Sequence, residues 1–182
     1  MPQIYMIVDV DRCWGCKSCQ VACKYEHGIP AGKVKPIEVF RIENKDVSGK
    51  VYCDYLPVMC QHCEKPECLD ACPVSAISRN EEGVVVVDSK LCTGCGLCAE
   101  SCPYDCITEE DGLAHKCDLC IERRSRGFPT SCEQHCMGRA FTSCTKEDME
   151  ALVAGRRYVW STGRVVYVSD QLSGLGKAFG KA

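Results

Sequence analysis

Features that often reveal a function are scarce in this sequence. No apolar run approaches the ~20 residues of a membrane-spanning helix, so we expect no direct membrane span. The opening residues, "MPQIYMIVDVDRC", lack the basic and apolar regions of a signal peptide, so we expect a cytoplasmic protein, or one exported only together with a partner. A net charge of −3 provides no basic surface for nucleic acid, and we expect no nucleic-acid partner.

Catalytic motifs and large apolar side chains are also in short supply. The chain has no recognisable acid–base pair and no G-x-G-x-x-G loop between a strand and a helix, so we expect a non-catalytic role. Aromatic residues make up only 7% of the 182 residues, and the hydrophobic fraction of 46% includes the cysteines. Such a chain relies on cross-links or metals as well as on a hydrophobic core.

Cysteine is the residue present in excess, with 19 in the chain. In a compartment that keeps thiols reduced, this density indicates metal or redox chemistry rather than disulfides. The cysteines form four blocks of four, spaced C-x2-C-x2-C-x3-C, C-x2-C-x4-C-x3-C, C-x2-C-x2-C-x3-C and C-x2-C-x11-C-x3-C. The blocks are Cys13, Cys16, Cys19, Cys23; Cys60, Cys63, Cys68, Cys72; Cys92, Cys95, Cys98, Cys102; and Cys117, Cys120, Cys132, Cys136.

This spacing predicts pairs of [4Fe-4S] clusters that exchange one ligand. Three cysteines close together bind three corners of one cubane, and the fourth, about one helical turn further on, ligates the neighbouring cluster. The second and third blocks therefore form an inner pair, and the first and fourth blocks form an outer pair by the same logic. The predicted ligand sets are Cys13, Cys16, Cys19, Cys136; Cys23, Cys117, Cys120, Cys132; Cys60, Cys63, Cys68, Cys102; and Cys72, Cys92, Cys95, Cys98.

Structural zinc is the alternative for these cysteines, because C-x2-C pairs often bind zinc. Zinc ligands come in pairs rather than in tight triplets with a distant fourth member, so the spacing favours iron–sulfur, less decisively for the fourth block. The three remaining cysteines are interpreted as inert small apolar residues. They are Cys53, Cys106 and Cys144. The histidines are interpreted as residues beside the clusters or on the surface; they are His27, His62, His115 and His135.

A short basic cluster precedes the last cysteines. It consists of Arg123, Arg124 and Arg126. We interpret it as a solvated helix face, with a docking patch for an acidic partner as the alternative.

Between the blocks, the sequence predicts short strands, hairpins and short helices. Residues 5–13 are rich in β-branched side chains and predict a strand that leads into the first block. Residues 37–44 and 50–58 are strand-like, and residues 145–155 predict a short helix with Thr145 as its N-cap. Hairpins are predicted in residues 76–92, 107–117 and 156–170.

The whole pattern resembles the four-cluster, ferredoxin-like electron-transfer (beta) subunits of molybdenum and tungsten oxidoreductases, with the dimethyl-sulfoxide-reductase family as reference. The resemblance covers residues 5 to about 145 and depends on the block order, on x4 in the second block, on Pro73 and Pro103 after two blocks, and on "KCDLC". Similar small subunits accompany tungsten enzymes of the aldehyde-oxidoreductase and benzoyl-CoA-reductase type. Two segments depart from the usual pattern: "CMGRA" replaces "CPTGA", and "CPYDCI" replaces "CPYGAI".

The resemblance implies a role in anaerobic metabolism as a wire of four [4Fe-4S] clusters, with the Cys13/Cys136 cluster nearest to a large catalytic subunit that carries a molybdenum or tungsten pterin cofactor. A further redox subunit or a ferredoxin would exchange electrons with the wire. Two other hypotheses are a free-standing soluble polyferredoxin and a zinc-stabilised binding or scaffold protein without a redox role.

We expect an α+β fold made of two nested bacterial-ferredoxin-like 2×[4Fe-4S] units with short strands, hairpins and short helices. Residues 1–144 are predicted to form the four-cluster domain, with the inner pair at about 53–106, the outer pair from 5–28 and 113–140, and an insertion at 29–52. Residues 145–182 are predicted to add a helix, a hairpin and a glycine-rich tail that docks on a partner.

Overall fold

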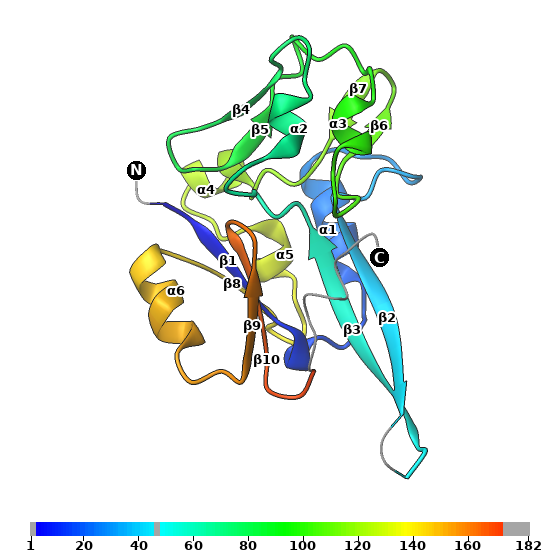
Figure 1. Cartoon of the computed structure of the whole chain (residues 1–182), viewed down its shortest axis with the longest axis vertical. Coiled ribbons are helices and arrows are strands. Elements are labelled where there is room, and N and C mark those ends of the chain that lie inside the picture. The colour runs from blue at the N-terminus through cyan, green and yellow to red at the C-terminus, as the bar shows by residue number, and fades with distance from the viewer. Residues whose placement is uncertain (1–2, 46–47, 173–182) are drawn as a thin grey trace.

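The computed structural model describes residues 3–45 and 48–172. A four-stranded sheet has the strand order β8-β1-β10-β9 (Figure 1). The central strands β1 and β10 are parallel, and both outer strands run antiparallel to their neighbours. The strands are β1 (Tyr5–Asp9), β8 (Phe141–Cys144), β9 (Tyr158–Ser161) and β10 (Val165–Ser169). The strand predicted at residues 5–13 is therefore confirmed in its first half, and it pairs with the C-terminal hairpin, which the sequence analysis did not foresee.

The sheet is covered on both faces. Met6 and Val8 of β1 belong to the main core, whereas Ile7 belongs to a smaller cluster on the opposite face, as the period of two in a strand requires. There Ile7 and Met149 of helix α6 (Lys146–Val153) share that smaller cluster, so α6 covers this face. Strand β10 lies inside the same sheet, which is covered on both faces, so all of its residues are buried.

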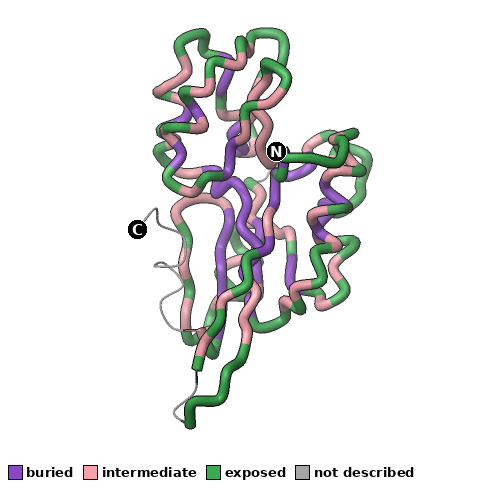
Figure 2. Tube along the Cα trace, turned by 90° about the vertical axis from the view of Figure 1, so that its right-hand side faces the viewer, coloured by how far each residue is buried: buried purple, intermediate pink, exposed green. Residues whose placement is uncertain are grey.

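The described part of the chain contains four β-hairpins. Three of them lie where the sequence predicts hairpins: β4 (Ile77–Arg79) with β5 (Val85–Val87), β6 (Thr108–Glu110) with β7 (Leu113–His115), and β9 with β10. The fourth joins β2 (Ile37–Lys45) to β3 (Val51–Met59), so the two strand-like runs pair with each other. This long hairpin projects from the body, and its far end is exposed (Figures 1 and 2).

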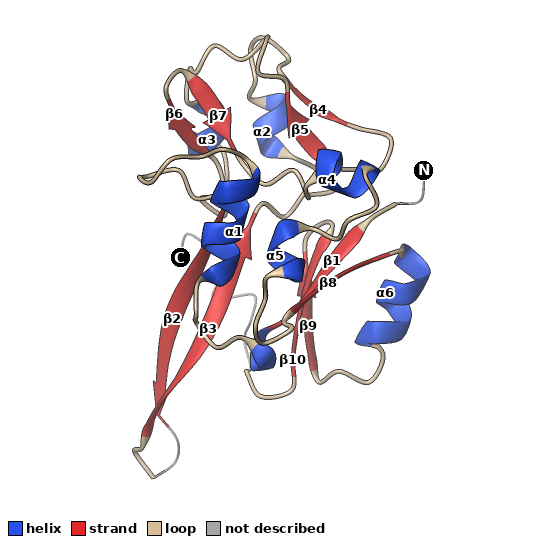
Figure 3. Ribbon diagram, turned by 180° about the vertical axis from the view of Figure 1, so that it is seen from behind, coloured by secondary structure: helices blue, strands red, loops and turns tan. Residues whose placement is uncertain are grey.

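Short helices accompany the cysteine blocks (Figure 3). They are α1 (Ser18–Glu26), α2 (Glu67–Asp70), α3 (Leu97–Glu100), α4 (Ile121–Ser125) and α5 (Ser131–Gln134), with the 3-10 turn η1 (Val10–Arg12) before the first block. Helix α1 packs against α5, and α2 packs against α3. The predicted helix near residue 145 is confirmed, since the Thr145 hydroxyl accepts a hydrogen bond from the Asp148 N–H at 3.3 Å. The expected α+β class with short strands, hairpins and short helices is confirmed as well.

The basic cluster was interpreted wrongly for two of its three arginines. The Arg123 side chain is 15% exposed and pairs with Glu26 at 2.6 Å. The Arg124 side chain is 14% exposed and pairs with Glu82 at 2.7 Å. Only Arg126, at 58% exposure, is a solvated charge. Opposite charges on distant segments, which the local pattern does not reveal, draw the first two inward.

Two further expectations concern membranes and the tail. Within residues 3–45 and 48–172, no helix has both the length and the apolar character needed to span a bilayer. The predicted docking tail lies almost entirely in residues 173–182, outside the described part of the chain.

Candidate metal centres

Each cysteine block opens with a C-x-x-C turn of the same backbone shape. The residue just before the second cysteine has a positive φ in all four: Gly15 (68°), His62 (47°), Gly94 (65°) and Leu119 (52°). Glycine adopts this left-handed conformation freely, whereas histidine and leucine are strained in it by about 1–2 kcal/mol. Such strain is typical of functional sites, and left-handed turns curl the backbone around a bound group.

Three predicted ligand sets each line one small hollow. We number the sets as quartets: quartet 1 is Cys13, Cys16, Cys19, Cys136; quartet 2 is Cys23, Cys117, Cys120, Cys132; quartet 3 is Cys60, Cys63, Cys68, Cys102; quartet 4 is Cys72, Cys92, Cys95, Cys98. The hollows of quartets 2, 3 and 4 each take all of their cysteines from a single predicted set. Each hollow draws these cysteines from two blocks, as the predicted exchange of the fourth ligand requires.

Quartet 1 gathers at the start of α1. The Cys13 thiol interacts electrostatically with Cys136 and Cys16, and Cys19 interacts with Cys13 and Cys136. The backbone N–H of Met137 reaches the Cys16 sulfur. The structure thus brings all sixteen predicted cysteines into four groups.

The four quartets follow one another in space. Cys19 and Cys23, four residues apart on α1, belong to quartets 1 and 2, and four residues of helix rise about 6 Å. The pair around α2, Cys68 and Cys72, joins quartets 3 and 4 in the same way. Quartets 2 and 3 meet at Cys106, whose thiol interacts electrostatically with Cys60 and Cys102 of quartet 3 and with Cys117 of quartet 2. The order is therefore 1, 2, 3, 4.

Burial differs between the ends and the middle of this row. Cys16 in quartet 1 and Cys95 in quartet 4 are exposed, whereas every cysteine of quartets 2 and 3 is buried or half-buried. Burial, with the nearby thiol of Cys60, raises the pKa of Cys68 to about 12, and burial raises the pKa of Cys132 to about 12. Thiols packed in this way ionise together only when a strong positive charge lies between them, which fits metal ligation.

A buried histidine supports this fit at quartet 3. His62 is fully buried and lines the hollow together with the cysteines. Its Nδ1 accepts a hydrogen bond from the Val85 N–H at 3.1 Å, so the proton of the neutral ring sits on Nε2. Among the described residues, Nε2 has no hydrogen-bond partner. A buried N–H donor such as His62 Nε2, which has no acceptor among the described residues, is expected to bond to an acceptor held in the hollow. The sulfur of a bound cluster would be such an acceptor.

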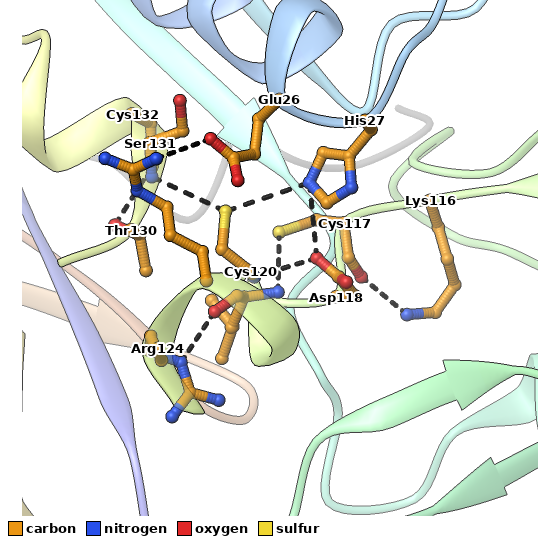
Figure 4. A network of polar contacts seen from close by, with 12 residues as sticks. Glu26, His27, Lys116, Cys117, Asp118, Cys120, Arg124, Thr130, Ser131 and Cys132 are labelled. Atoms are coloured by element: carbon orange, nitrogen blue, oxygen red, sulfur yellow. Dashed lines mark hydrogen bonds and ion pairs between the residues drawn. The ribbon is translucent and has the colours of Figure 1, made fainter. Parts of the chain in front are cut away.

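The surroundings of quartet 2 are polar (Figure 4). The Cys120 sulfur accepts the Ser131 N–H at 3.5 Å and lies 3.7 Å from His27 Nε2. His27 is also 3.5 Å from Asp118, so His27, Asp118 and Cys120 form a compact group of possible metal ligands. Because Cys120 also lines the hollow, this group belongs to quartet 2 rather than to a separate site.

Two neighbours of the quartets escaped the sequence analysis. The Thr130 hydroxyl lies 3.4 Å from the Cys132 sulfur. The Lys116 ammonium donates to the Cys117 carbonyl at 2.7 Å and to the Val85 carbonyl, so it ties the fourth block to the inner hairpin. Lys116 belongs to the "KCDLC" motif, in which the sequence analysis assigned a role only to the cysteines.

The three spare cysteines lie in different settings. Cys53 on β3 accepts a hydrogen bond from Arg41 Nε at 3.2 Å. Cys144 on β8 is half-buried, and burial with the nearby Asp148 carboxylate raises its pKa to about 11. Cys106 is buried; its backbone N–H donates to the Cys102 sulfur at 3.5 Å, and its thiol donates to the Tyr104 carbonyl at 3.2 Å.

Comparisons with known proteins agree with this geometry. The family model described as a 4Fe-4S dicluster domain matches residues 51–146. One subunit of the tetrathionate reductase of Salmonella typhimurium is 38% identical over 138 residues, in an alignment that covers 74% of this chain and 55% of that protein. One subunit of the anaerobic dimethyl sulfoxide reductase of Escherichia coli is 36% identical over 146 residues, in an alignment that covers 76% of this chain and 71% of that protein.

A third relative matches a larger share of the chain. The iron-sulfur subunit of the nitrate-inducible formate dehydrogenase of Escherichia coli is 34% identical over 171 residues, in an alignment that covers 85% of this chain and 58% of that protein. The chain thus spans little more than half of the length of this relative and of the tetrathionate reductase subunit.

Proposed function

Because this protein is a member of the 4Fe-4S dicluster family, we propose that it relays single electrons within an oxidoreductase complex whose catalytic subunit carries a molybdenum or tungsten pterin cofactor. Its cofactors are four [4Fe-4S] clusters. The relatives are named as subunits of tetrathionate reductase, dimethyl sulfoxide reductase and formate dehydrogenase, which supports a subunit role without catalysis by this protein.

The sixteen cysteines of quartets 1–4 would hold these clusters. The observation that carries this assignment is the grouping itself. Cysteines from different blocks line one hollow in each of quartets 2, 3 and 4. Quartets 1 and 2 share helix α1, and Cys68 in α2 and Cys72 just after it belong to quartets 3 and 4. When bound, each cluster supplies a one-electron redox couple.

The protein's own groups set the environment of each cluster. Backbone N–H groups donate to ligand sulfurs, for example from Ala76 to Cys72 and from Ala140 to Cys136, both at 3.2 Å. Such hydrogen bonds stabilise negative charge on sulfur and so favour the reduced state. Burial of quartets 2 and 3 keeps water away from the middle of the row, where no partner needs access.

Both ends of the row offer apolar surface to partners. Trp14 and Met137, beside quartet 1, are 65% and 66% exposed. Val74, Leu91 and Leu97, around quartet 4, are 40%, 52% and 43% exposed. Exposed apolar groups of this kind mark interaction sites. We assign the quartet 1 end to the catalytic subunit and the quartet 4 end to a further redox subunit or a ferredoxin.

We also propose a cytoplasmic location, or export only with the catalytic partner, because cysteines used as metal ligands suit a compartment that keeps thiols reduced.

Anaerobic purification from the native host tests the proposal. Iron, zinc and acid-labile sulfide are quantified, and co-purifying chains are identified together with their molybdenum or tungsten content. We expect about sixteen iron atoms per chain and a large subunit that carries one of these metals.

Other outcomes separate the alternatives. A colourless protein with about one zinc per four cysteines would identify a zinc scaffold. About eight iron atoms together with zinc would restrict the clusters to the inner pair. A monomeric protein with all four clusters and no partner would identify a polyferredoxin.

A further inference from the structure

The four C-x-x-C turns share their backbone shape but differ in one side chain. The residue before the second cysteine has a positive φ in each turn, and it is Gly15, His62, Gly94 or Leu119. The glycines have no side chain and the leucine is apolar, so only the turn of the second block carries a polar group at this place. Histidine holds this left-handed conformation at a cost of about 1–2 kcal/mol, and strain of this kind is retained at functional sites.

A β-hairpin holds the His62 ring in one orientation. The ring is fully buried, and its Nδ1 accepts the Val85 N–H at 3.1 Å. The Val85 carbonyl accepts from the Lys116 ammonium, and Arg79 of β4 donates to the Cys63 carbonyl. The hairpin of β4 and β5 is thus tied both to the second block and to the fourth, which fixes Val85 and with it the ring.

This orientation leaves one ring proton without an acceptor in the described part of the chain. Because Nδ1 is an acceptor, the proton of the ring lies on Nε2. Nε2 is buried and has no hydrogen-bond partner among the described residues. His62 and Val85 line the hollow of quartet 3 together with all four of its cysteines. A buried N–H group requires an acceptor, and this hollow is the space beside the ring that can hold one.

Sulfur at this site would be a strong acceptor for the Nε2 proton. Iron-bound cysteines are thiolates, and a hydrogen bond to an anionic acceptor is roughly twice as strong as one to a neutral acceptor. Reduction adds negative charge to a cluster, so an N–H donor to its sulfur favours the reduced state. Because the ring is shielded from water, the low local dielectric strengthens this interaction.

We propose that the Nε2–H group of His62 donates a hydrogen bond to a sulfur atom of the quartet 3 cluster and thereby raises the reduction potential of this cluster. The equivalent residues of the other three turns, Gly15, Gly94 and Leu119, provide no side-chain donor, so the effect is specific to quartet 3. The inference rests on the proposed ligation of quartet 3. It assigns His62 a part in electron transfer through the middle of the row, beyond its part in packing.

Redox titrations of the anaerobically purified protein, with its partner where one co-purifies, test this role. Electron paramagnetic resonance follows the midpoint potential of each cluster in the wild type and in His62→Leu, His62→Gln and His115→Leu. Leucine copies Leu119, which adopts the same backbone conformation with a φ of 52°. Glutamine replaces the ring by an amide whose Nε2 still donates. His115→Leu is the matched control, because the His115 ring lies 3.3 Å from the Glu110 carbonyl of its own hairpin.

We expect His62→Leu to keep four clusters and to lower one midpoint potential, that of the cluster missing in Cys68→Ala. His62→Gln should lower this midpoint less, and His115→Leu should leave all four unchanged. Unchanged midpoints in His62→Leu, equal shifts in the leucine and glutamine variants, or the same shift in the control would each overturn the proposal. Loss of a cluster from folded His62→Leu protein would also overturn it, because His62 would then be structural.

A second measurement leaves His62 in place. In protein labelled with ¹⁵N-histidine, pulsed electron paramagnetic resonance of the reduced clusters should detect a ¹⁵N coupling that disappears in Cys68→Ala and remains in Cys98→Ala. Absence of such a coupling would overturn the proposal even where His62→Leu does not fold. A wild type without four clusters would instead contradict the proposed function.

Discussion

The two cysteine quartets of the inner pair share their local motif and differ in their surroundings. Quartet 3 is enclosed: its hollow is lined by Gln61 and His62, both buried, and by Tyr104, which packs edge-on against Trp160 of the sheet at 5.9 Å. Quartet 4 has an exposed cysteine, Cys95, and is lined by glycines and small apolar residues. The comparison teaches that the local motif sets how the cysteines are arranged, whereas the packing of distant segments sets how much solvent reaches them.

Removing one ligand from each inner quartet is expected to have the largest effect. Cys68→Ala should lose the quartet 3 cluster and Cys98→Ala the quartet 4 cluster, each about four of sixteen iron atoms. Cys68→Ala should also yield less folded protein, because the two buried thiols and one half-buried thiol that remain then lose the positive charge that held them together. Iron analysis and the yield of monodisperse protein measure both effects. Cys53→Ala is the control and should retain all the iron; equal yields for the two ligand variants would contradict the difference in burial.

The next largest effect, on stability, is expected when Gly94 in the third block is substituted, with Gly96 as its comparison. A Cβ on Gly94 would lie 2.5 Å from the backbone of Gly112, and its φ is +65°. Gly94→Ala should therefore cost about 2–4 kcal/mol and disturb quartet 4 while leaving quartet 3 intact. Gly96 also has a positive φ, +79°, but nothing lies within 4 Å of an added Cβ. Gly96→Ala should cost only about 1–2 kcal/mol. Denaturation followed by the visible absorbance of the clusters compares the two, and equal losses would rule out the clash with Gly112.

An oxidant in solution should react at different rates with the clusters of quartets 3 and 4. A hydrophilic oxidant such as ferricyanide is expected to attack the quartet 4 cluster several-fold faster than the quartet 3 cluster, because Cys95 is exposed. The time course of oxidised-cluster signals in electron paramagnetic resonance, assigned with Cys68→Ala and Cys98→Ala, measures the two rates. Faster loss of the quartet 3 cluster would show that the enclosure seen here does not protect it.

The smallest expected effect concerns the ion pair between Glu82 and Arg124, which ties the inner β4–β5 turn to α4. The hydrogen bond from Arg124 lowers the pKa of Glu82 below its ordinary value of 4.5. A carboxyl group whose pKa is lower in the folded state stabilises the protein above the unfolded-state pKa, and this contribution is lost as pH falls through the folded-state value. Glu82→Gln should therefore cost about 1 kcal/mol at pH 7 and progressively less in acid.

Denaturant midpoints at neutral and acidic pH, again followed by cluster absorbance, measure this contribution. Glu81→Gln is the control, since Glu81 is exposed and next in sequence. A pH-independent loss in Glu82→Gln, or an equal loss in Glu81→Gln, would contradict the ion pair as the cause.

Much of the local structure could be predicted from the sequence. Three hairpins and the helix at Thr145 follow from turn residues, alternation and capping, which are short-range signals. The basic cluster could not be interpreted in this way, because Glu26 and Glu82 reach Arg123 and Arg124 from distant segments. The sequence analysis left open whether His62 lies beside a cluster or on the surface, since a histidine in a cysteine motif gives no local sign of its exposure; the structure buries it in the lining of the quartet 3 hollow.

The sequence by itself predicted the four cysteine groups, because the x2 and x3 intervals allow few arrangements of thiolates around a pair of clusters. Only the tertiary structure decided that β10 inserts between β1 and β9. In this arrangement Trp160 packs on Tyr104, and Tyr167 accepts a hydrogen bond from Gln61; Tyr104 and Gln61 both line the hollow of quartet 3. The tertiary structure also placed Cys106 between quartets 2 and 3, with its backbone N–H on the Cys102 sulfur. These arrangements depend on contacts between residues far apart in the chain, whose strength is set by packing and burial rather than by sequence neighbours.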